Sequence, residues 1–220
     1  MPQTKNKIIL FDLGNTLIYR EKTHRQYDIE LAQSITKKSG ASISTAINRH
    51  LSGFPGVYDF NIDNNKCRSL ENEDNYNQNF FKLIFADINS ADKLDVFMQK
   101  RNSQTRYHLF PGSLKILKRL KELDFKLGVA SNGRPSRRRI MKQLGIYKYF
   151  KPDAIYISDE MGIAKPSSAF FAKITKDFDS FKFALYDDEE CHIKAAQKKG
   201  WDVILINHNS KGFRHLVNTL

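Results

Sequence analysis

The sequence predicts an α/β fold, in which helices cover both faces of a parallel sheet and an all-helical segment is inserted after the first strand. Three observations support this fold class. Short apolar runs alternate with helical patterns through the second half of the 220-residue chain. The segment from residue 21 to residue 108 has no convincing strand pattern. Small and polar residues follow the apolar runs, as they do at the ends of buried strands.

The strands of the predicted sheet are five short apolar runs of typical strand length. They lie at residues 7–11, 126–130, 154–157, 181–186 and 202–206. Helical patterns lie between and beside the later runs, at residues 112–123, 135–144, 167–176 and 190–199. Alternating strands and helices of these lengths predict a parallel sheet with helices on both faces.

The segment between the first strand and the rest of the sheet is predicted to be a helical cap. Its helical patterns run over residues 25–38, 44–51, 76–88 and 91–103. The polar, Asn-rich stretch at 60–75 is expected to be a loop, and Pro111 and Gly112 mark the return to the sheet. We therefore expect a core domain made of residues 1–20 and 109–220, and a helical cap domain made of residues 21–108.

The composition limits the class of protein. Hydrophobic residues make up 40% of the chain, enough for a packed core, and no apolar run approaches the ~20 residues that span a bilayer. Two distant cysteines, Cys67 and Cys191, form no disulfide framework or zinc site, so a cytoplasmic protein is expected. The net charge of +12 is spread along the chain. We interpret it first as a solvated basic surface and second as attraction of small anions, whereas nucleic-acid binding is the least favoured interpretation.

Polar residues that suit catalysis follow four separate strands of the predicted sheet. They are Asp12 with the turn Gly14-Asn15-Thr16, then Ser131-Asn132-Gly133, then Lys165-Pro166, and finally Asp187-Asp188. In an open α/β sheet, ligands bind beyond the carboxyl ends of the strands. Each cluster alone has an ordinary structural explanation as a turn, a helix cap or a solvated loop. Their joint placement at one edge predicts a site.

These residue types suit chemistry on phosphate esters. A carboxylate such as Asp12 can attack phosphorus and form an aspartyl-phosphate, but it repels the phosphate unless a cation lies between them. Mg²⁺ prefers oxygen ligands, which Asp12, Asp187 and Asp188 can supply. Ser131 can donate a hydrogen bond to the phosphate, and Lys165 can neutralise charge on the nucleophile and the transferred group.

The same residues resemble the motifs of the haloacid dehalogenase-like hydrolase superfamily. The matching segments are Phe11-Asp12-Leu13-Gly14-Asn15-Thr16-Leu17, Gly128-Val129-Ala130-Ser131-Asn132-Gly133, Gly162-Ile163-Ala164-Lys165-Pro166, and Leu185-Tyr186-Asp187-Asp188. The resemblance covers the chain outside the cap, and the helical insertion looks like the family's C1 cap. It implies a Rossmann-like core and Asp12 as the nucleophile. It also implies Mg²⁺ held by Asp12, the Gly14 carbonyl and Asp187, with Asp188 nearby. We expect phosphate contacts from Thr16, Ser131, Asn132 and Lys165.

The sequence departs from the family pattern at Gly14. Family phosphatases usually carry there a second aspartate, which protonates the leaving oxygen and later activates water; such catalysis typically contributes ~10²–10⁴-fold. Some phosphatases of the family's glucose-1-phosphate branch share the Asp-Leu-Gly-Asn start. The candidates for the missing group are Glu21, His24, Asp28 and His192. His192 also stands where the family often has Asn or Asp, a position that supports the metal loop.

These considerations favour a Mg²⁺-dependent phosphatase that hydrolyses a small soluble phosphomonoester, such as a sugar phosphate or a nucleotide. Two alternatives stay open: a haloacid dehalogenase, and a phosphate-binding module with the fold but little turnover. The expected partner is a small phosphorylated metabolite, with neither nucleic acid nor membrane, and the chain is expected to be a monomer or a homodimer.

Overall fold

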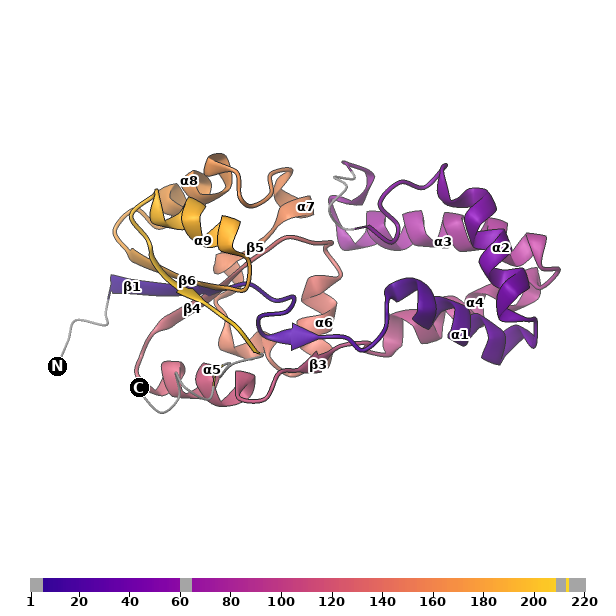
Figure 1. Cartoon of the computed structure of the whole chain (residues 1–220), viewed down its shortest axis with the longest axis horizontal. Helices are drawn as coiled ribbons and strands as arrows, with labels where there is room; N and C mark the ends of the chain where they lie inside the picture. Colours follow the sequence, from indigo (N-terminus) through magenta and orange to yellow (C-terminus); the bar gives the residue numbers. More distant parts are fainter. Residues whose placement is uncertain (1–5, 60–64, 209–212, 214–220) are drawn as a thin grey trace.

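The computed structural model describes residues 6–59, 65–208 and 213 of the chain. Its centre is a parallel sheet of five strands in the order β5-β4-β1-β6-β7 (Figure 1). The strands are β1 (Lys7–Phe11), β4 (Lys126–Ser131), β5 (Ile155–Ile157), β6 (Lys182–Asp187) and β7 (Asp202–Leu205). The predicted parallel sheet is confirmed, and each observed strand overlaps its predicted range.

The central strand β1 is buried because its side chains pack alternately on the two faces of the sheet. Ile9 and Phe11 belong to one apolar cluster, with residues of α5 (Ser113–Glu122) and α6 (Arg137–Gln143). Ile8 and Leu10 belong to the other cluster, with residues of α8 (Ser168–Asp177) and α9 (Glu190–Gln197). Figure 1 shows these two helix layers on opposite sides of the sheet. Because successive side chains of β1 point to opposite faces of the sheet, this strand contributes to the apolar clusters on both faces.

The register of the sheet brings the ends of three strands level. Phe11 at the end of β1 pairs with Val129 of β4 and with Tyr186 of β6. Beyond this level β6 continues for one residue and β4 for two, so the three strands end at the same edge of the sheet. The short helix α7 (Ser158–Met161), which the sequence does not predict, begins directly after β5 at that edge.

Gly128 in β4 is a position where the sheet tolerates no side chain. A Cβ there would lie 2.5 Å from the carbonyl oxygen of Ala154 and 2.7 Å from Cδ2 of Leu10. We expect Gly128→Ala to lower the free energy of unfolding by ~1–3 kcal/mol, the usual cost of overpacking a core. The urea midpoint measures this loss. Gly53→Ala is the control, because its Cβ would meet only the His50 carbonyl oxygen at an ordinary 3.6 Å. Equal midpoints for both variants would contradict the packing argument.

The inserted segment forms a helical cap with an apolar core of its own. Its helices are α1 (His24–Thr36), α2 (Gly40–Leu51), α3 (Leu70–Asp87) and α4 (Leu94–Ser103). Phe80, Phe81, Phe85 and Phe97 lie at the centre of their packing. The two chain connections to the sheet pair with each other as a short antiparallel ribbon, β2 (Ile18–Tyr19) with β3 (His108–Leu109). Separate clusters on the two sides of this ribbon support the domain division at residues 20/21 and 108/109, which stays a prediction.

The structure corrects two expectations within the cap. The prediction of a loop over 60–75 is wrong for its later part: Asn65–Cys67 form a 3₁₀ turn and α3 begins at Leu70. The cause is Ser69, whose hydroxyl accepts from the Asn72 N–H and caps a helix that the Asn-rich sequence obscures. Residues 60–64 lie outside the described part of the chain. Likewise α2 begins at Gly40 rather than at residue 44, because Ser39 caps it.

Smaller elements complete the chain. Further 3₁₀ turns lie at Ala91–Lys93, Tyr147–Tyr149 and Pro152–Ala154. In the part of the chain that the structure describes, no helix combines the length and apolar character needed to cross a membrane.

Candidate active site

A buried lysine joins two carboxylates at the carboxyl edge of the sheet. The Lys165 Nζ donates to Asp12 Oδ1 at 2.9 Å and to Asp187 Oδ2 at 2.5 Å. The exposed fraction is 7% for Asp12, 3% for Lys165 and zero for Asp187. Asp12 comes directly after β1 and its N–H donates to the Tyr186 carbonyl of β6 (2.9 Å). Three residues that the sequence predicts together therefore do meet.

Lys165 is held in place by Asn132. The Lys165 backbone N–H donates to Asn132 Oδ1, and Asn132 Nδ2 donates to the Lys165 carbonyl, both at 2.9 Å. Because Asn132 Nδ2 carries two N–H groups, one of them stays available for another acceptor. Ser131 is fully buried and its hydroxyl donates to the Asn132 carbonyl at 3.4 Å. The phosphate contacts expected of these two residues stay predictions.

Three further hydrogen bonds orient the paired aspartates. His192 Nδ1 lies 3.0 Å from Asp187 Oδ1, and the Glu189 N–H donates to the same oxygen at 2.9 Å. The Thr16 hydroxyl donates to Asp188 Oδ1 at 3.0 Å and is buried. Thr16 therefore positions Asp188, and its backbone N–H donates to the Leu13 carbonyl at 3.3 Å, so the phosphate contact expected of Thr16 stays a prediction.

The three aspartates of this cluster differ in the direction in which their surroundings shift the pKa. Burial raises the pKa of Asp12 above its ordinary value, although the Lys165 ammonium opposes the shift. Burial acts the same way on Asp187, but Lys165 and His192 outweigh it and hold its pKa below the ordinary value. Burial and the charge of Asp12 raise the pKa of Asp188 to about 6. Two of the three carboxylates, Asp12 and Asp187, thus share the Lys165 ammonium, and Asp188 lies close enough to repel them.

The donor chemistry of the cluster suits a hard divalent cation. Within residues 6–59, 65–208 and 213, no group of three or more His, Cys, Asp or Glu side chains is arranged so that it could hold a metal ion. The oxygen donors are nevertheless those that Mg²⁺ prefers: carboxylates of Asp12, Asp187 and Asp188, and the carbonyl of Gly14. Such a cation would offset the negative charge that the Lys165 ammonium leaves uncompensated. The residues present therefore fit Mg²⁺.

Asp12 opens into a cavity between the core and the cap, with a volume of about 550 Å³. Gly14, Lys165 and Asp188 line it from the core, and Tyr58 lines it from the cap. Its volume is typical of sites for small ligands. The cap and the core therefore enclose part of a ligand-sized space next to the predicted nucleophile.

The structure separates the candidates for the missing proton donor. Glu21 is exposed, and Asp28 is buried in the cap between Arg101 (3.0 Å) and Arg106 (2.7 Å). His24 Nε2 lies 2.8 Å from the Tyr107 hydroxyl, and burial together with nearby arginines holds its pKa well below the ordinary value. Of these described candidates only His192 lines the cavity, and its Nδ1 is engaged with Asp187.

Sequence reasoning did not assign several residues of the cavity to the site, among them Tyr58 and Arg137. Arg137 belongs to the densest basic run of the chain, but nothing in the sequence distinguishes it from its neighbours. Arg138 pairs with Glu160 and Arg139 pairs with Asp74, whereas Arg137 points to the cavity. Tyr58 lies in a loop of the cap without a motif.

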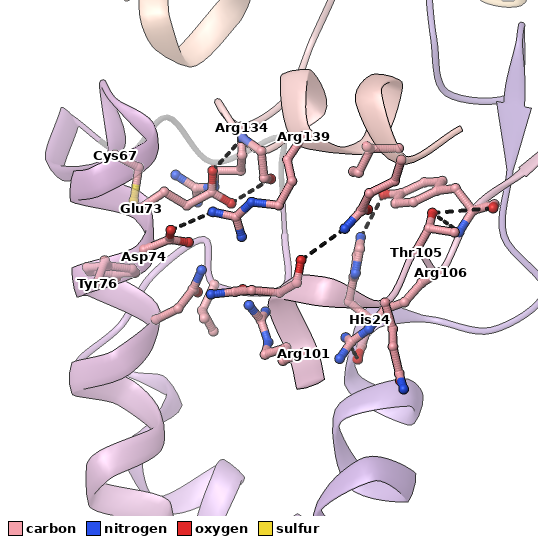
Figure 2. Close-up of a pocket in the computed structure, with 18 residues that line it drawn as sticks. His24, Cys67, Glu73, Asp74, Tyr76, Arg101, Thr105, Arg106, Arg134 and Arg139 are labelled. Carbon is pink, nitrogen blue, oxygen red and sulfur yellow. Dashed lines mark hydrogen bonds and ion pairs between the residues drawn. The ribbon is translucent and has the colours of Figure 1, made fainter. Parts of the chain in front are cut away.

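Polar contacts between α3 and α6 fix the cap over the core. The Glu73 carboxylate of α3 accepts from the Ser136 N–H and from the Ser136 hydroxyl, both at 2.7 Å. Arg134 pairs with Asp159 and also donates to the Gly56 carbonyl in the cap. Figure 2 shows these groups around a smaller cavity of about 70 Å³, in which Glu73, Asp74, Arg134 and Arg139 lie close together. The cap is thus tied to the helix that carries Arg137.

Comparison with known proteins gives one family match. The family model of the haloacid dehalogenase-like hydrolases matches residues 6–200 of the chain. This range includes strands β1 to β6, the whole cap and all of the cluster around Lys165.

One curated relative is the uncharacterized protein YMR130W of Saccharomyces cerevisiae. It is 29% identical to the chain over 123 residues. The match covers 48% of this chain and 40% of the relative, so the chain spans well under two thirds of that protein's length.

Solved structures with a similar fold include both phosphatases and dehalogenases. A HAD phosphatase of Thermococcus onnurineus is 20% identical with a TM-score of 0.58, over 93% of this chain and 87% of that one. A 2-haloacid dehalogenase of Pseudomonas syringae is 17% identical with a TM-score of 0.61, over 94% and 89%. A HAD-family enzyme of Bacteroides thetaiotaomicron, solved with magnesium and inorganic phosphate, is 19% identical with a TM-score of 0.57, over 96% and 98%. At these identities the likeness is one of fold.

Proposed function

Since the chain belongs to the haloacid dehalogenase-like hydrolases, we propose that it is a Mg²⁺-dependent phosphatase that forms an aspartyl-phosphate on Asp12. The observation that carries this proposal is the cluster of Asp12 and Asp187 around the ammonium of Lys165, with Asp188 close enough for the charge of Asp12 to raise its pKa. Three carboxylates would repel a carboxylic acid substrate. They suit a phosphate that is bound together with a divalent cation.

In the proposed reaction, Asp12 attacks the phosphorus and the bond to the leaving oxygen breaks. Lys165 keeps Asp12 ionised and oriented, and it offsets charge on the transferred group. Water then attacks the phosphorus of the aspartyl-phosphate, which releases inorganic phosphate and the Asp12 carboxylate. Mg²⁺, when held by Asp12, Asp187, Asp188 and the Gly14 carbonyl, supplies positive charge that lets a carboxylate approach a phosphate.

The substrate that we propose is a small soluble phosphomonoester. A cavity of about 550 Å³ has room for a sugar phosphate or a nucleotide, and Tyr58 closes it from the cap side. A cap tied to the core through Glu73 and Arg134 would exclude bulk water from the intermediate.

Gly14 favours two other functions enough to include them in the test. A haloacid dehalogenase needs no acid at this position, and a binding module needs no turnover at all. The purified protein is assayed with an aryl phosphate and with a 2-haloacid, each with Mg²⁺ and with a chelator. We expect phosphate release that requires Mg²⁺ and no halide release. Halide release that persists with chelator would replace the proposal by a dehalogenase. No turnover on a broad panel of phosphorylated metabolites would leave the binding module.

Asp187 is expected to set the Mg²⁺ requirement. We predict that Asp187→Asn raises the Mg²⁺ concentration for half-maximal activity by more than about tenfold, because loss of groups that only support metal ligands already costs about 10–100-fold. A Mg²⁺ titration of phosphatase activity measures this change. Asp202→Asn is the control, since Asp202 lies on the neighbouring strand β7 in an exposed pair with Lys7. Identical titrations for the two variants would remove Asp187 from the metal site.

A further inference from the structure

Arg137 is a buried cation whose hydrogen-bonding capacity is not used. Its exposed fraction is 8%, and its Nη1 finds no hydrogen-bond partner among the residues that the structure describes. Buried guanidinium groups are normally paired, because an unsatisfied buried charge is unfavourable. The neighbouring Arg138 and Arg139 follow that rule through Glu160 and Asp74. Because Arg137 also lines the cavity of Asp12, its unpaired donor indicates that this side of the cavity can accept an anionic partner.

The guanidinium occupies the space beside Gly14. A Cβ on Gly14 would lie 3.3 Å from Arg137 Nη2, and a Cβ on Gly133 would lie 2.8 Å from Arg137 Nε. On a third side, the Tyr107 ring lies 5.2 Å from the guanidinium carbon. Two glycines and an aromatic ring thus fix the side chain where the family's second aspartate would begin. Its charge acts on Asp12, whose pKa it helps to lower against the effect of burial.

We propose that Arg137 takes the place of the missing proton donor by binding the leaving-group oxygen as an anion, which directs the enzyme to acyl phosphates and phosphoanhydrides. Arginine does not give up its proton in proteins, so it stabilises the leaving oxygen by charge and hydrogen bonds alone. This inference rests on the proposed phosphatase function and narrows its substrate class. An alkyl phosphate would release an alkoxide, which needs a proton, whereas a carboxylate or a phosphate leaves as a stable anion.

The step balances without an acid. The Asp12 oxygen forms a bond to phosphorus, and the bond from phosphorus to the leaving oxygen breaks with its electron pair on that oxygen. The leaving group departs as an anion next to the Arg137 guanidinium. Water then attacks the phosphorus, the Asp12 carboxylate is released, and the proton of the water passes to the phosphate or to solvent.

Other polar groups that line the cavity are less suited to stabilise a leaving anion. The Lys165 ammonium is already shared by Asp12 and Asp187, and the Nδ1 atom of His192 is bound to Asp187. Burial raises the pKa of the Tyr58 phenol well above its usual range, which makes it a weak proton donor. Two arginines line the cavity, Arg20 and Arg137, and only Arg137 is buried, so its guanidinium is the one best placed to stabilise a leaving anion.

The test is the dependence of kcat/KM on the pKa of the leaving group. The substrates are a series of aryl phosphates, an alkyl phosphate, acetyl phosphate and pyrophosphate, all with Mg²⁺. For the unmodified protein we expect a steep fall in kcat/KM as the leaving-group pKa rises, with acetyl phosphate or pyrophosphate far above the alkyl phosphate. The last two substrates distinguish an acyl phosphate from a phosphoanhydride as the preferred class.

Arg137→Gln is expected to lose about 10²-fold in kcat, and most on the poorest leaving groups, because less negative charge is stabilised as the bond breaks. Arg138→Gln is the matched control from the same helix and should keep the original dependence. Arg137→Lys should regain part of the lost activity, and added guanidinium ion should partly restore Arg137→Ala, which separates chemistry from misfolding.

Two results would overturn the inference alone. One is turnover by the unmodified protein that does not depend on the leaving-group pKa. The other is a loss in Arg137→Gln that is equal for all substrates. Absence of turnover on every substrate would instead contradict the proposed function, and this inference with it.

Discussion

Asp12→Asn is expected to abolish phosphate release while the protein stays folded. The asparagine side chain has the shape of the aspartate but lacks the charged oxygen that attacks phosphorus. Loss of the nucleophile in enzymes with covalent intermediates costs roughly 10⁴-fold or more in kcat. Asp12 is nearly buried and bonds Lys165 through one oxygen, and an amide oxygen can still accept that bond. Turnover of an aryl phosphate with Mg²⁺ measures the effect.

The design of this experiment needs two controls. Mass spectrometry must show that the asparagine has not reverted to aspartate by deamidation, since a trace of reverted protein would appear as residual activity. Asp177→Asn supplies the comparison, because Asp177 lies on α8 and pairs with the exposed Lys173 and with the Tyr156 hydroxyl. Activity in Asp12→Asn close to that of Asp177→Asn would remove Asp12 as the nucleophile.

Lys165→Met is expected to damage both stability and activity. The lysine is the only ammonium between Asp12 and Asp187 in the described structure, and its side chain is fully buried. Removing it leaves two buried carboxylates without the ammonium that both of them bond, and breaking a buried pair in this way costs ~3–5 kcal/mol. Methionine has a similar length, so lost volume contributes little. Denaturant unfolding in the presence of a chelator measures the loss, because a bound cation would partly replace the ammonium.

The activity of Lys165→Met should also fall by roughly 10²-fold or more, since the ammonium faces the attacking carboxylate. Lys173→Met is the matched control: this lysine is half exposed and pairs with Asp177 on the surface of α8. Surface pairs contribute ~0–1 kcal/mol, so its urea midpoint should barely move. A Lys165→Met protein as stable as Lys173→Met would mean that the buried cluster is not held by this ion pair.

The sequence predicts the core fold well because the strands of the core are marked by short, continuous apolar runs, which can be recognised locally. The apolar run of β1 and the runs of β4 and β6 are long enough to be recognised, and parallel pairing then aligns their ends. That alignment is why Asp12, Lys165 and Asp187 could be expected in one place. In the cap, by contrast, the start of α3 depends on a single capping residue, Ser69, within a polar stretch.

The sequence predicts which residues belong to the site, but it does not predict which hydrogen bonds their side chains form there. Thr16 and Asn132 were expected to contact phosphate, yet their side chains bond Asp188 and the Lys165 backbone. Those choices depend on loops that meet only in the folded chain. The gap at Gly14 is visible in the sequence, whereas the guanidinium beside it is not. Arg137 reaches Gly14 from α6, more than a hundred residues along the chain.

The central claim, that Asp12 carries the phosphoryl group, is tested most directly by trapping the intermediate. The protein is mixed with Mg²⁺ and acetyl phosphate or an aryl phosphate, quenched in acid early in turnover, digested and analysed by mass spectrometry. We predict that the peptide containing Asp12 gains one phosphoryl group, that hydroxylamine removes it, and that Asp12→Asn never acquires it. Steady turnover with the phosphoryl group on another residue, or with no phosphorylated peptide at any quench time, would contradict the account.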